Sequence, residues 1–352
     1  MDDSVFKPIP AEYYSDPAEA PMQSPPQSGP EINFLDPDAL IAFVDRHRTQ
    51  SREKAGYAEH IDQRIRAAGF ACRRLAQLPD DWRSLIDEFS RDFPNFGALT
   101  DLLHNHFALH AMGDARVSWP PILLVGPPGI GKTEAVRWWS ERLGLPFRVV
   151  DMSSAQTGVM LSGTEQYWRN SEPGVLFKLL AFQSLANPIL LLDEIDKGAE
   201  SRINGPDPLS ALYTLLEPRS ARTFTDLWIT DFSVDASHVN WIATANSAQS
   251  IPAPILSRMT LLRIDKPTPD QVSRIARNIY GRLRADAPWG KSFDAYLSDD
   301  VVRRLQTLPP RALIQVLLRA FGRAARASRT YVTPDDLPRE WNSGRRKIGF
   351  TD

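Results

Sequence analysis

Cysteine is almost absent from this sequence, and its scarcity limits the chemistry that the chain can perform. Among the 352 residues there is a single cysteine, Cys72. One thiol cannot form an intrachain disulfide, and it cannot build a zinc site whose ligands are mainly cysteines. We therefore expect a chain that folds in a reducing compartment without covalent cross-links.

An excess of positive charge and long apolar runs are also missing. The chain has 41 Lys and Arg residues against 43 Asp and Glu, which gives a formal net charge of −2. It therefore lacks the general positive field that draws proteins to nucleic acids or anionic lipids. No apolar run approaches the ~20 residues needed to cross a bilayer, and the first four residues do not resemble a basic secretory leader. These features predict a cytoplasmic protein that does not associate with membranes.

Proline content and helical periodicity divide the chain into regions. Residues 1–30 hold seven of the 29 prolines, and such a composition buries too little apolar surface to fold. Apolar residues then recur at helical spacing, give way to short apolar runs beyond Pro94, and return to helical spacing after Pro267. The predicted regions are a disordered arm (1–30), a helical N-terminal region (31–92), an α/β domain (93–266), a helical lid domain (267–337) and a basic tail (338–352).

Short apolar runs separated by amphipathic stretches are typical of a parallel sheet with crossover helices. The predicted strands are Ile122–Val125, Phe147–Val150, Ile189–Leu192, Trp241–Ala245 and Leu261–Ile264. A loop rich in Gly, Asp, Asn or Ser follows each run, at the edge where open α/β sheets bind their ligands. The predicted fold class is α/β, a five-stranded parallel sheet with flanking helices followed by a small all-helical lid domain.

A glycine-rich loop follows the first predicted strand. Gly126-Pro127-Pro128-Gly129-Ile130-Gly131-Lys132-Thr133 fits the pattern G-x-x-x-x-G-K-[ST], and a helix-compatible stretch comes next. The glycines let consecutive N–H groups point inwards, and the helix N-terminus adds partial positive charge. Lys132 can then reach the β- and γ-phosphates of a nucleotide, while the Thr133 hydroxyl ligates Mg²⁺. The loop predicts the polyphosphate site of a P-loop NTPase.

Polar residues follow two further predicted strands. Asp193 and Glu194 come directly after Ile189–Leu192, where Asp193 can hold Mg²⁺ and Glu194 can activate the attacking water as general base. Asn246 follows Trp241–Ala245, and its neutral amide can orient that water. Alone, an acidic pair or an Asn after a strand is commonly a solvated turn. Together with the glycine-rich loop, these residues predict nucleotide hydrolysis.

Taken together, these segments resemble the AAA+ ATPases, and most closely the ATPase module of Lon proteases. The similarity covers residues 96–337 and is strongest in Gly126–Thr133, Leu191–Lys197, Ala243–Ser247 and Ile251–Met259. It implies an AAA+ fold and a Mg²⁺-dependent ATPase with ATP and Mg²⁺ as cofactors. It also implies a homo-oligomeric ring, expected to be a hexamer, that remodels, unfolds or threads a protein substrate.

The resemblance also implies roles for three further residues. Arg258 falls at the position of the arginine finger, which reaches the γ-phosphate bound by the neighbouring subunit. Arg311, at the start of a lid helix, falls at the position of the second sensor, which links the lid to the nucleotide state. Phe96 resembles the segment that packs on adenine. A surface ion pair is the alternative for both arginines, and a core position is the alternative for Phe96.

Tyr167 and Trp168 align with the aromatic–hydrophobic pore loop of the Lon branch, whose rings press on a threaded polypeptide. Arg169 stands where the family usually has glycine, and a core position for the two rings is the alternative. Lon proteases carry a Ser-Lys protease domain after the lid, whereas this sequence ends 15 residues after Leu337. We therefore expect no peptidase activity from the chain itself, with a separately encoded protease or adaptor as a partner.

Three histidines lie near one another on a predicted helix. His104, His106 and His110 fall within seven residues, and His106 and His110 stand one helical turn apart. Such a pair can ligate a metal ion. No third ligand lies nearby in the sequence, so an ordinary helix face is the simpler interpretation.

Arginines gather on the late lid helix and in the tail. Arg319, Arg323 and Arg326 recur at helical spacing, and Arg345-Arg346-Lys347 follows. A solvated or subunit-contacting face is the simplest interpretation, but the cluster leaves a nucleic-acid-associated motor or loader as the alternative function. A nucleotide-gated scaffold without turnover is disfavoured by the intact general base, Asn and arginine finger.

Overall fold

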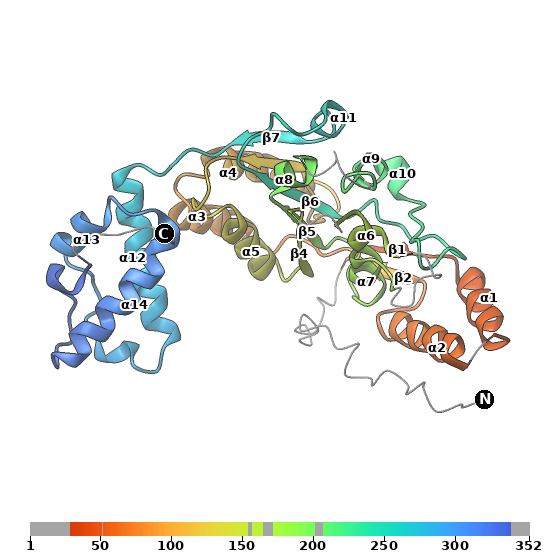
Figure 1. Ribbon diagram of the computed structural model, residues 1–352, viewed down its shortest axis with the longest axis horizontal. Coiled ribbons are helices and arrows are strands. Elements are labelled where there is room, and N and C mark those ends of the chain that lie inside the picture. Colours follow the sequence, from red (N-terminus) through yellow and green to blue (C-terminus); the bar gives the residue numbers. More distant parts are fainter. Residues whose placement is uncertain (1–28, 51, 154–156, 165–171, 201–206, 339–352) are drawn as a thin grey trace, which may run out of the picture. The chain divides into compact units, whose positions relative to one another are not determined.

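The computed structural model describes residues 29–50, 52–153, 157–164, 172–200 and 207–338, which divide into two compact units (Figure 1). The first unit comprises the described residues up to Trp82 together with Leu102–Val125 and Thr133–Leu262. The second comprises Arg83–Asp101, Gly126–Lys132 and the described residues from Arg263 onwards. No helix within these ranges combines the length and the apolar character that a membrane span requires.

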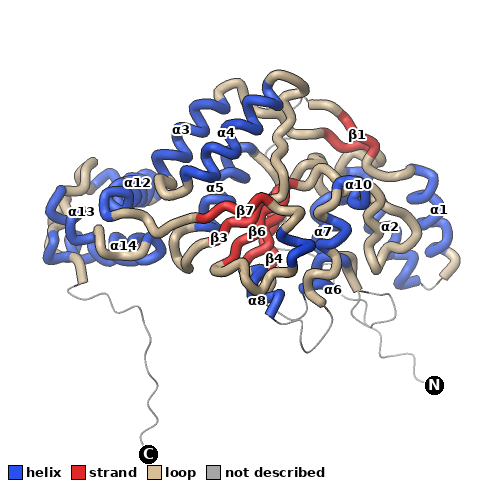
Figure 2. Tube along the Cα trace, turned by 90° about the horizontal axis from the view of Figure 1, so that it is seen from above, coloured by secondary structure: helices blue, strands red, loops and turns tan. Residues whose placement is uncertain are grey.

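A five-stranded sheet has the strand order β4-β5-β6-β3-β7. Figure 2 shows strands in red, with β3, β4, β6 and β7 labelled. Its strands are β3 (Ile122–Val125), β4 (Phe147–Asp151), β5 (Ile189–Asp193), β6 (Asn240–Ala245) and β7 (Thr260–Arg263). The pairs β4/β5, β5/β6 and β6/β3 are parallel. β6 and nearly all of β5 are buried, which is why they appear in the sequence as continuous apolar runs. The predicted α/β fold is confirmed, with strand bounds within one residue of those expected.

One helix precedes the first strand of the sheet and others connect the strands. They are α4 (Gly97–Ala111), α5 (Lys132–Leu143), α6 (Thr157–Ser162), α7 (Val175–Ala181), α8 (Ile195–Glu200), α9 (Leu212–Leu215), α10 (Pro218–Ala221) and α11 (Ala253–Leu256). α5 directly follows the glycine-rich loop, and α8 begins two residues after β5 ends. Because the paired strands are parallel, the polar residues after β5 and β6 meet at one edge of the sheet.

The N-terminal part of the first unit combines two helices with a small strand pair. α1 (Pro37–Arg48) begins after Asp36, whose carboxylate caps its first turn, and it packs against α2 (Arg52–Ala67). β1 (Glu31–Asn33) and β2 (Cys72–Arg74) pair in antiparallel register. The sequence predicted only helices here, because strands of three residues are too short to show an alternating pattern.

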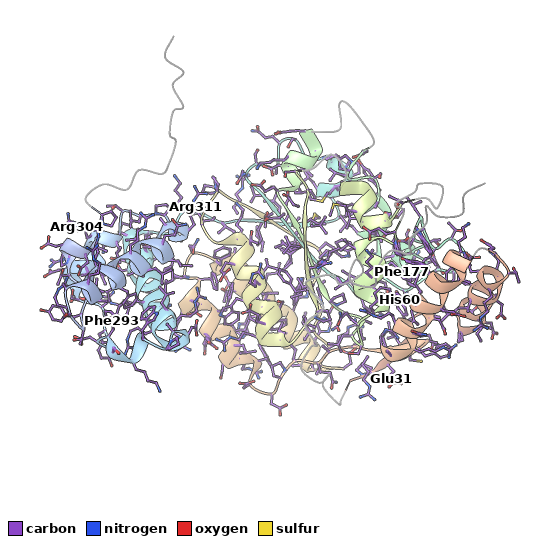
Figure 3. The ribbon with its side chains drawn as sticks, turned by 60° about the horizontal axis from the view of Figure 1, so that its bottom comes forward. Glu31, His60, Phe177, Phe293, Arg304 and Arg311 are labelled. Carbon is purple, nitrogen blue, oxygen red and sulfur yellow. The ribbon has the colours of Figure 1, made fainter. Side chains whose placement is uncertain are left out.

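This N-terminal part shares its core with the rest of the first unit. The ring of Phe232 contacts Phe43 of α1 and Phe177 of α7, with centroid distances of 5.6 and 6.1 Å. Ile61 and Ile65 of α2 are fully buried in the same cluster. Figure 3 labels Phe177 on α7 together with His60 on α2, the two helices that border this region.

Arg73 of β2 fastens the N-terminal part to α7. The residue is 1% exposed, and its guanidinium donates to the main-chain oxygens of Phe70, Leu180 and Ala181 at 2.8, 3.3 and 2.7 Å. It also lies over the ring of Phe34, 4.6 Å from the centroid. Burial lowers the pKa of Arg73 to about 10. Main-chain carbonyls thus bind this buried cation, and they use up most of its donors.

Helices build the second unit. The first is α3 (Trp82–Asp92), whose first residue, Trp82, still belongs to the first unit. The lid helices are α12 (Pro269–Asp286), α13 (Asp299–Leu305) and α14 (Pro310–Arg326), with the short 3₁₀ turns η3 (Gly290–Ser292) and η4 (Pro334–Asp336). Thr268 and Gln271 form a capping box at the start of α12. Phe293 packs edge-on against Phe321 inside the lid, whereas Arg304 of α13 lies at its surface (Figure 3). The predicted helical lid is confirmed.

Candidate functional site

Residues 126–133 form the loop between β3 and the body of α5 that the sequence predicted to bind phosphate. Gly129 and Gly131 have φ angles of 78° and 101°, a region that residues with a Cβ rarely adopt. Lys132 Nζ donates to the main-chain oxygens of Gly126 at 2.6 Å and Pro127 at 3.1 Å. The loop therefore curls around the ammonium group of its own lysine.

Thr133 and Asp193 meet where the sequence expected a metal-bound phosphate. The Thr133 hydroxyl donates to both carboxylate oxygens of Asp193, each at 3.2 Å. Thr244 of β6, the strand beside β5, donates its own hydroxyl to the same carboxylate. Hydroxyl and carboxylate oxygens are the ligands that Mg²⁺ prefers, so this donor set fits the metal of a magnesium–nucleotide complex.

Glu194 occupies an uncommon backbone conformation next to Asp193. Its φ angle is 57°, which is costly for a residue with a side chain and is found mostly at functional sites. The Glu194 N–H donates to the Thr244 hydroxyl at 3.0 Å, and its carboxylate forms an ion pair with Lys197. The hydrogen bond with Glu194 raises the pKa of Lys197. Thr133, Asp193, Glu194 and Thr244 are called the acidic edge below.

Asn246 lies directly after β6, and its main chain is held by a buried carboxylate. The N–H groups of Asn246 and Ser247 both donate to Asp196 Oδ2, at 2.9 and 3.2 Å. Asp196 belongs to α8, which follows the acidic edge in the chain. The structure therefore joins two of the predicted segments through Asp196, a residue for which no sequence motif predicted a role.

Arg258, the expected arginine finger, lies near an acidic partner within its own chain. Its Nε atom is 3.4 Å from Glu217 Oε2, and its Nη1 donates to the main-chain oxygen of Pro254 at 2.6 Å. The side chain is 31% exposed. A surface ion pair was the alternative to the arginine-finger role, and Arg258 and Glu217 form such a pair.

Arg311 lies against the glycine-rich loop within the second unit. A Cβ atom added at Gly129 would lie 2.9 Å from Cδ of Arg311, so the aliphatic stem of the arginine passes directly over the loop. Figure 3 shows Arg311 at the start of α14. With Lys132, the second unit places two cationic side chains at the loop, an arrangement that favours a polyanionic ligand.

The remaining residues that were predicted to contact a ligand are Phe96, Tyr167 and Trp168. Phe96 has no exposed surface and packs against the rings of Phe89 and Phe93, which is the core position that the sequence left open. Tyr167 and Trp168 lie outside the described residues.

The two ends of the segment that carries the predicted pore loop are fastened together by described residues. Thr164 N–H donates to the main-chain oxygen of Glu172 at 3.1 Å. Asp226 accepts the N–H of Gly174 at 2.8 Å, and a Cβ added at Gly163 would collide with the same carboxylate. Asp226 is 1% exposed, and this burial raises its pKa to about 6. A lone Asp in a mixed loop gave no sequence signal for this role.

The weaker sequence signals are largely structural. Burial lowers the pKa of both His106 and His110, and the described ranges contain no group of three or more His, Cys, Asp or Glu suited to hold a metal ion. In the arginine cluster, Arg323 donates to the main-chain oxygens of Asp336 and Leu337 at 3.1 and 3.3 Å. Arg323 of this cluster therefore binds main-chain groups at the C-terminal end of the lid.

Comparison with known families agrees with this geometry. Residues 122–265 match the family model described as "ATPase family associated with various cellular activities (AAA)". This part of the chain is similar to an AAA ATPase domain. The matched range contains the glycine-rich loop, the acidic edge, Asn246 and Arg258.

Proteins similar to this chain include Lon proteases. Lon protease homolog 2, peroxisomal, from Spinacia oleracea is 33% identical over 322 residues, covering 84% of this chain and 36% of that protein. Lon protease from Metamycoplasma arthritidis is 39% identical over 163 residues, covering 46% of this chain and 19% of that protein. The chain thus spans about a third or less of the length of these relatives. Among solved structures, the Thermotoga maritima RuvB Holliday junction branch migration motor matches with a TM-score of 0.46 and 16% identity, covering 69% of this chain and 66% of that one.

Sequence reasoning missed several residues that hold the polar groups of the candidate site in place. Thr244, Asp196 and Lys197 lie inside the segments that carried the family resemblance, so their positions were visible while their contacts were not. Glu217, the partner of Arg258, lies 41 residues before it in the chain and belongs to no motif. Contacts of this kind depend on how the elements pack, so a local sequence pattern does not reveal them.

Proposed function

We propose that this chain binds ATP with Mg²⁺ and hydrolyses it to ADP and phosphate. The observation that carries the proposal is the acidic edge, where the Thr133 hydroxyl, the Asp193 carboxylate and the strained Glu194 share hydrogen bonds through Thr244. Oxygen ligands for a metal and a carboxylate for a water lie together there. Mg²⁺, when bound, would neutralise phosphate charge.

Each residue would have a distinct task in this proposal. The main-chain N–H groups of residues 126–133 and the Lys132 ammonium would bind the phosphates. Thr133 and Asp193 would hold Mg²⁺. Glu194 would accept the proton of the attacking water after its carboxylate leaves Lys197, and Asn246 would orient that water.

We further propose that the active form is a homo-oligomeric ring, a hexamer by analogy with the AAA+ family. Arg258 would act on the nucleotide of the neighbouring subunit, and Arg311 would report the nucleotide state to the lid. Glu217 would hold the Arg258 side chain in the isolated chain. Assembly would exchange this ion pair for contact with phosphate, whose oxygens a guanidinium can bind in bidentate geometry.

The proposed use of the ATP energy is to remodel, unfold or thread a protein substrate. The Lon relatives support this choice, with Tyr167 and Trp168 as the residues that would grip the polypeptide. A separately encoded protease or adaptor would complete the system. We ascribe no peptide-bond cleavage to these residues themselves.

The first experiment measures ATP hydrolysis by the purified chain with and without casein as an unfolded protein. Glu194→Gln should still bind ATP, but its turnover should fall at least ~100-fold, because the amide cannot accept the proton from water. Undiminished turnover in this variant would contradict the assignment. Stimulation by casein would support protein remodelling.

Two further arms separate the alternatives. If Arg258 acts between subunits, Arg258→Ala should lower turnover only in the assembled state, and adding Glu194→Gln subunits with intact Arg258 should restore part of it. Stimulation by DNA instead of casein, with a steep dependence on salt, would favour the nucleic-acid motor.

A further inference from the structure

Asp196 is a buried carboxylate at the start of α8, two residues after Glu194. Only 6% of the residue is exposed. Its Oδ2 atom accepts the main-chain N–H groups of Asn246 and Ser247 at 2.9 and 3.2 Å. Its own main-chain oxygen accepts the hydroxyl of Ser250 at 3.1 Å. One residue of α8 is therefore bonded three times to the loop that follows β6.

The second carboxylate oxygen of Asp196 lowers the stability of the folded chain. Asp196 Oδ1 is buried and has no hydrogen-bond partner among the described residues. Burying an incompletely bonded carboxylate opposes folding, so a purely structural link would be better served by a neutral side chain. A carboxylate has one advantage over a neutral amide at this position. It accepts stronger hydrogen bonds from the two N–H groups.

We propose that Asp196 is a positioning residue for ATP hydrolysis, which fixes the direction of Asn246 relative to Glu194. The inference rests on the proposed ATPase function. Asn246 is the first residue after β6, so the orientation of its main chain decides where its side chain points. Glu194 lies only two residues from Asp196. The carboxylate therefore ties the general base and the water-orienting amide into one rigid arrangement, although 50 residues separate Asp196 from Asn246 in the sequence.

The alternative is that Asp196 merely stabilises the fold. A structural role would lower stability and activity together, whichever residue stands at position 246. A positioning role acts through the Asn246 side chain, and it disappears when that side chain is removed. A double-mutant cycle between these two positions separates the alternatives.

The experiment compares the wild-type chain, Asp196→Asn, Asn246→Ala and the double variant. For each, the Kd for ATP, kcat and the thermal unfolding temperature are measured. Asp196→Asn keeps the shape but weakens the two hydrogen bonds, so we expect kcat to fall roughly 10-fold while the Kd changes less than about 3-fold. In the Asn246→Ala background, the same change should cost less than about 2-fold.

Ser250→Ala is the matched control, because it removes a bond to the main chain of Asp196 and leaves the carboxylate intact. It should change kcat less than about 2-fold. Should Asp196→Asn fold poorly, Asp196→Glu keeps the charge and moves the acceptor by one methylene, and it should show the same loss of kcat and the same dependence on Asn246.

Equal losses of kcat in the two backgrounds, with an active wild-type chain, would overturn the positioning role and leave the ATPase proposal intact. An unchanged kcat in Asp196→Asn would also overturn it. A wild-type chain that binds ATP without turnover would overturn the proposed function and this inference together.

Discussion

The acidic edge and the Arg73 anchor use polar side chains in opposite ways. At the acidic edge the Glu194 side chain is 37% exposed, and Asp193 is only partly buried, so their carboxylate oxygens keep capacity for a ligand. At the anchor Arg73 is buried, and main-chain oxygens take up its donors. Polar groups with spare bonding capacity point to function, whereas groups with exhausted capacity hold the fold together.

Removing the buried cation should test the anchor most severely. Arg73→Met leaves the carbonyls of Phe70, Leu180 and Ala181 without their donor inside the core. We expect the N-terminal part to lose about 3–5 kcal/mol of stability, since each buried acceptor left unpaired is costly. Hydrogen exchange of the amides in α2 and α7 measures this loss.

Arg74→Met provides the matched control for that change. Arg74 is the next residue, but its side chain is 43% exposed and pairs with Glu31 at the surface. Exposed pairs contribute little, so the control should cost no more than about 1 kcal/mol. Equal effects of the two substitutions would show that Arg73 is no anchor.

Asp226 lies between the two cases, because it is buried like Arg73 yet accepts hydrogen bonds as a carboxylate. Its pKa is raised to about 6, so the folded chain binds a proton that the unfolded chain has lost between about pH 4 and 6. Stability should therefore fall as pH rises through this window, by roughly 2–3 kcal/mol from this group.

Asp226→Asn cannot titrate and should lack this contribution. The stability of the wild-type chain minus that of the variant should be larger at pH 4 than at pH 7, measured by chemical denaturation. Subtraction cancels the histidine titrations that both chains share. A difference that stays constant with pH would mean that Asp226 is ionised throughout and belongs with the functional carboxylates.

Thr244→Val is the mildest change and probes the acidic edge. It removes the hydroxyl that donates to Asp193 and accepts from the N–H of Glu194, while keeping nearly the same volume. We expect ATP turnover to fall about 10-fold, equivalent to about 1.4 kcal/mol, because Glu194, the proposed general base, loses its support. Steady-state hydrolysis assays measure this effect.

Thr244→Ser should restore most of that loss, since it returns the hydroxyl without the methyl group. Full activity in Thr244→Val would show that the edge does not depend on this hydrogen-bond bridge. The comparison between edge and anchor would then rest on burial alone.

Sequence patterns predicted the larger elements of the fold with good accuracy. The strands around Leu190 and Ile242 could be found because parallel strands buried on both faces form unbroken apolar runs. β1 and β2 could not be found, since a ladder of three pairs has no periodicity of its own. Arg73 carried no signal either, because a buried arginine looks like an exposed one in the sequence.

The candidate site divides in the same way. Local sequence determined the loop through Gly129 and Gly131, and the residues that follow β5 and β6, because short motifs and strand ends fix them. The partners that these residues contact follow from the folding of the whole chain. Asp196 bonds to a loop 50 residues away, and Arg73 reaches carbonyls 107 and 108 residues away. Such contacts depend on how elements pack, and packing is a property of the whole fold rather than of any local stretch of sequence.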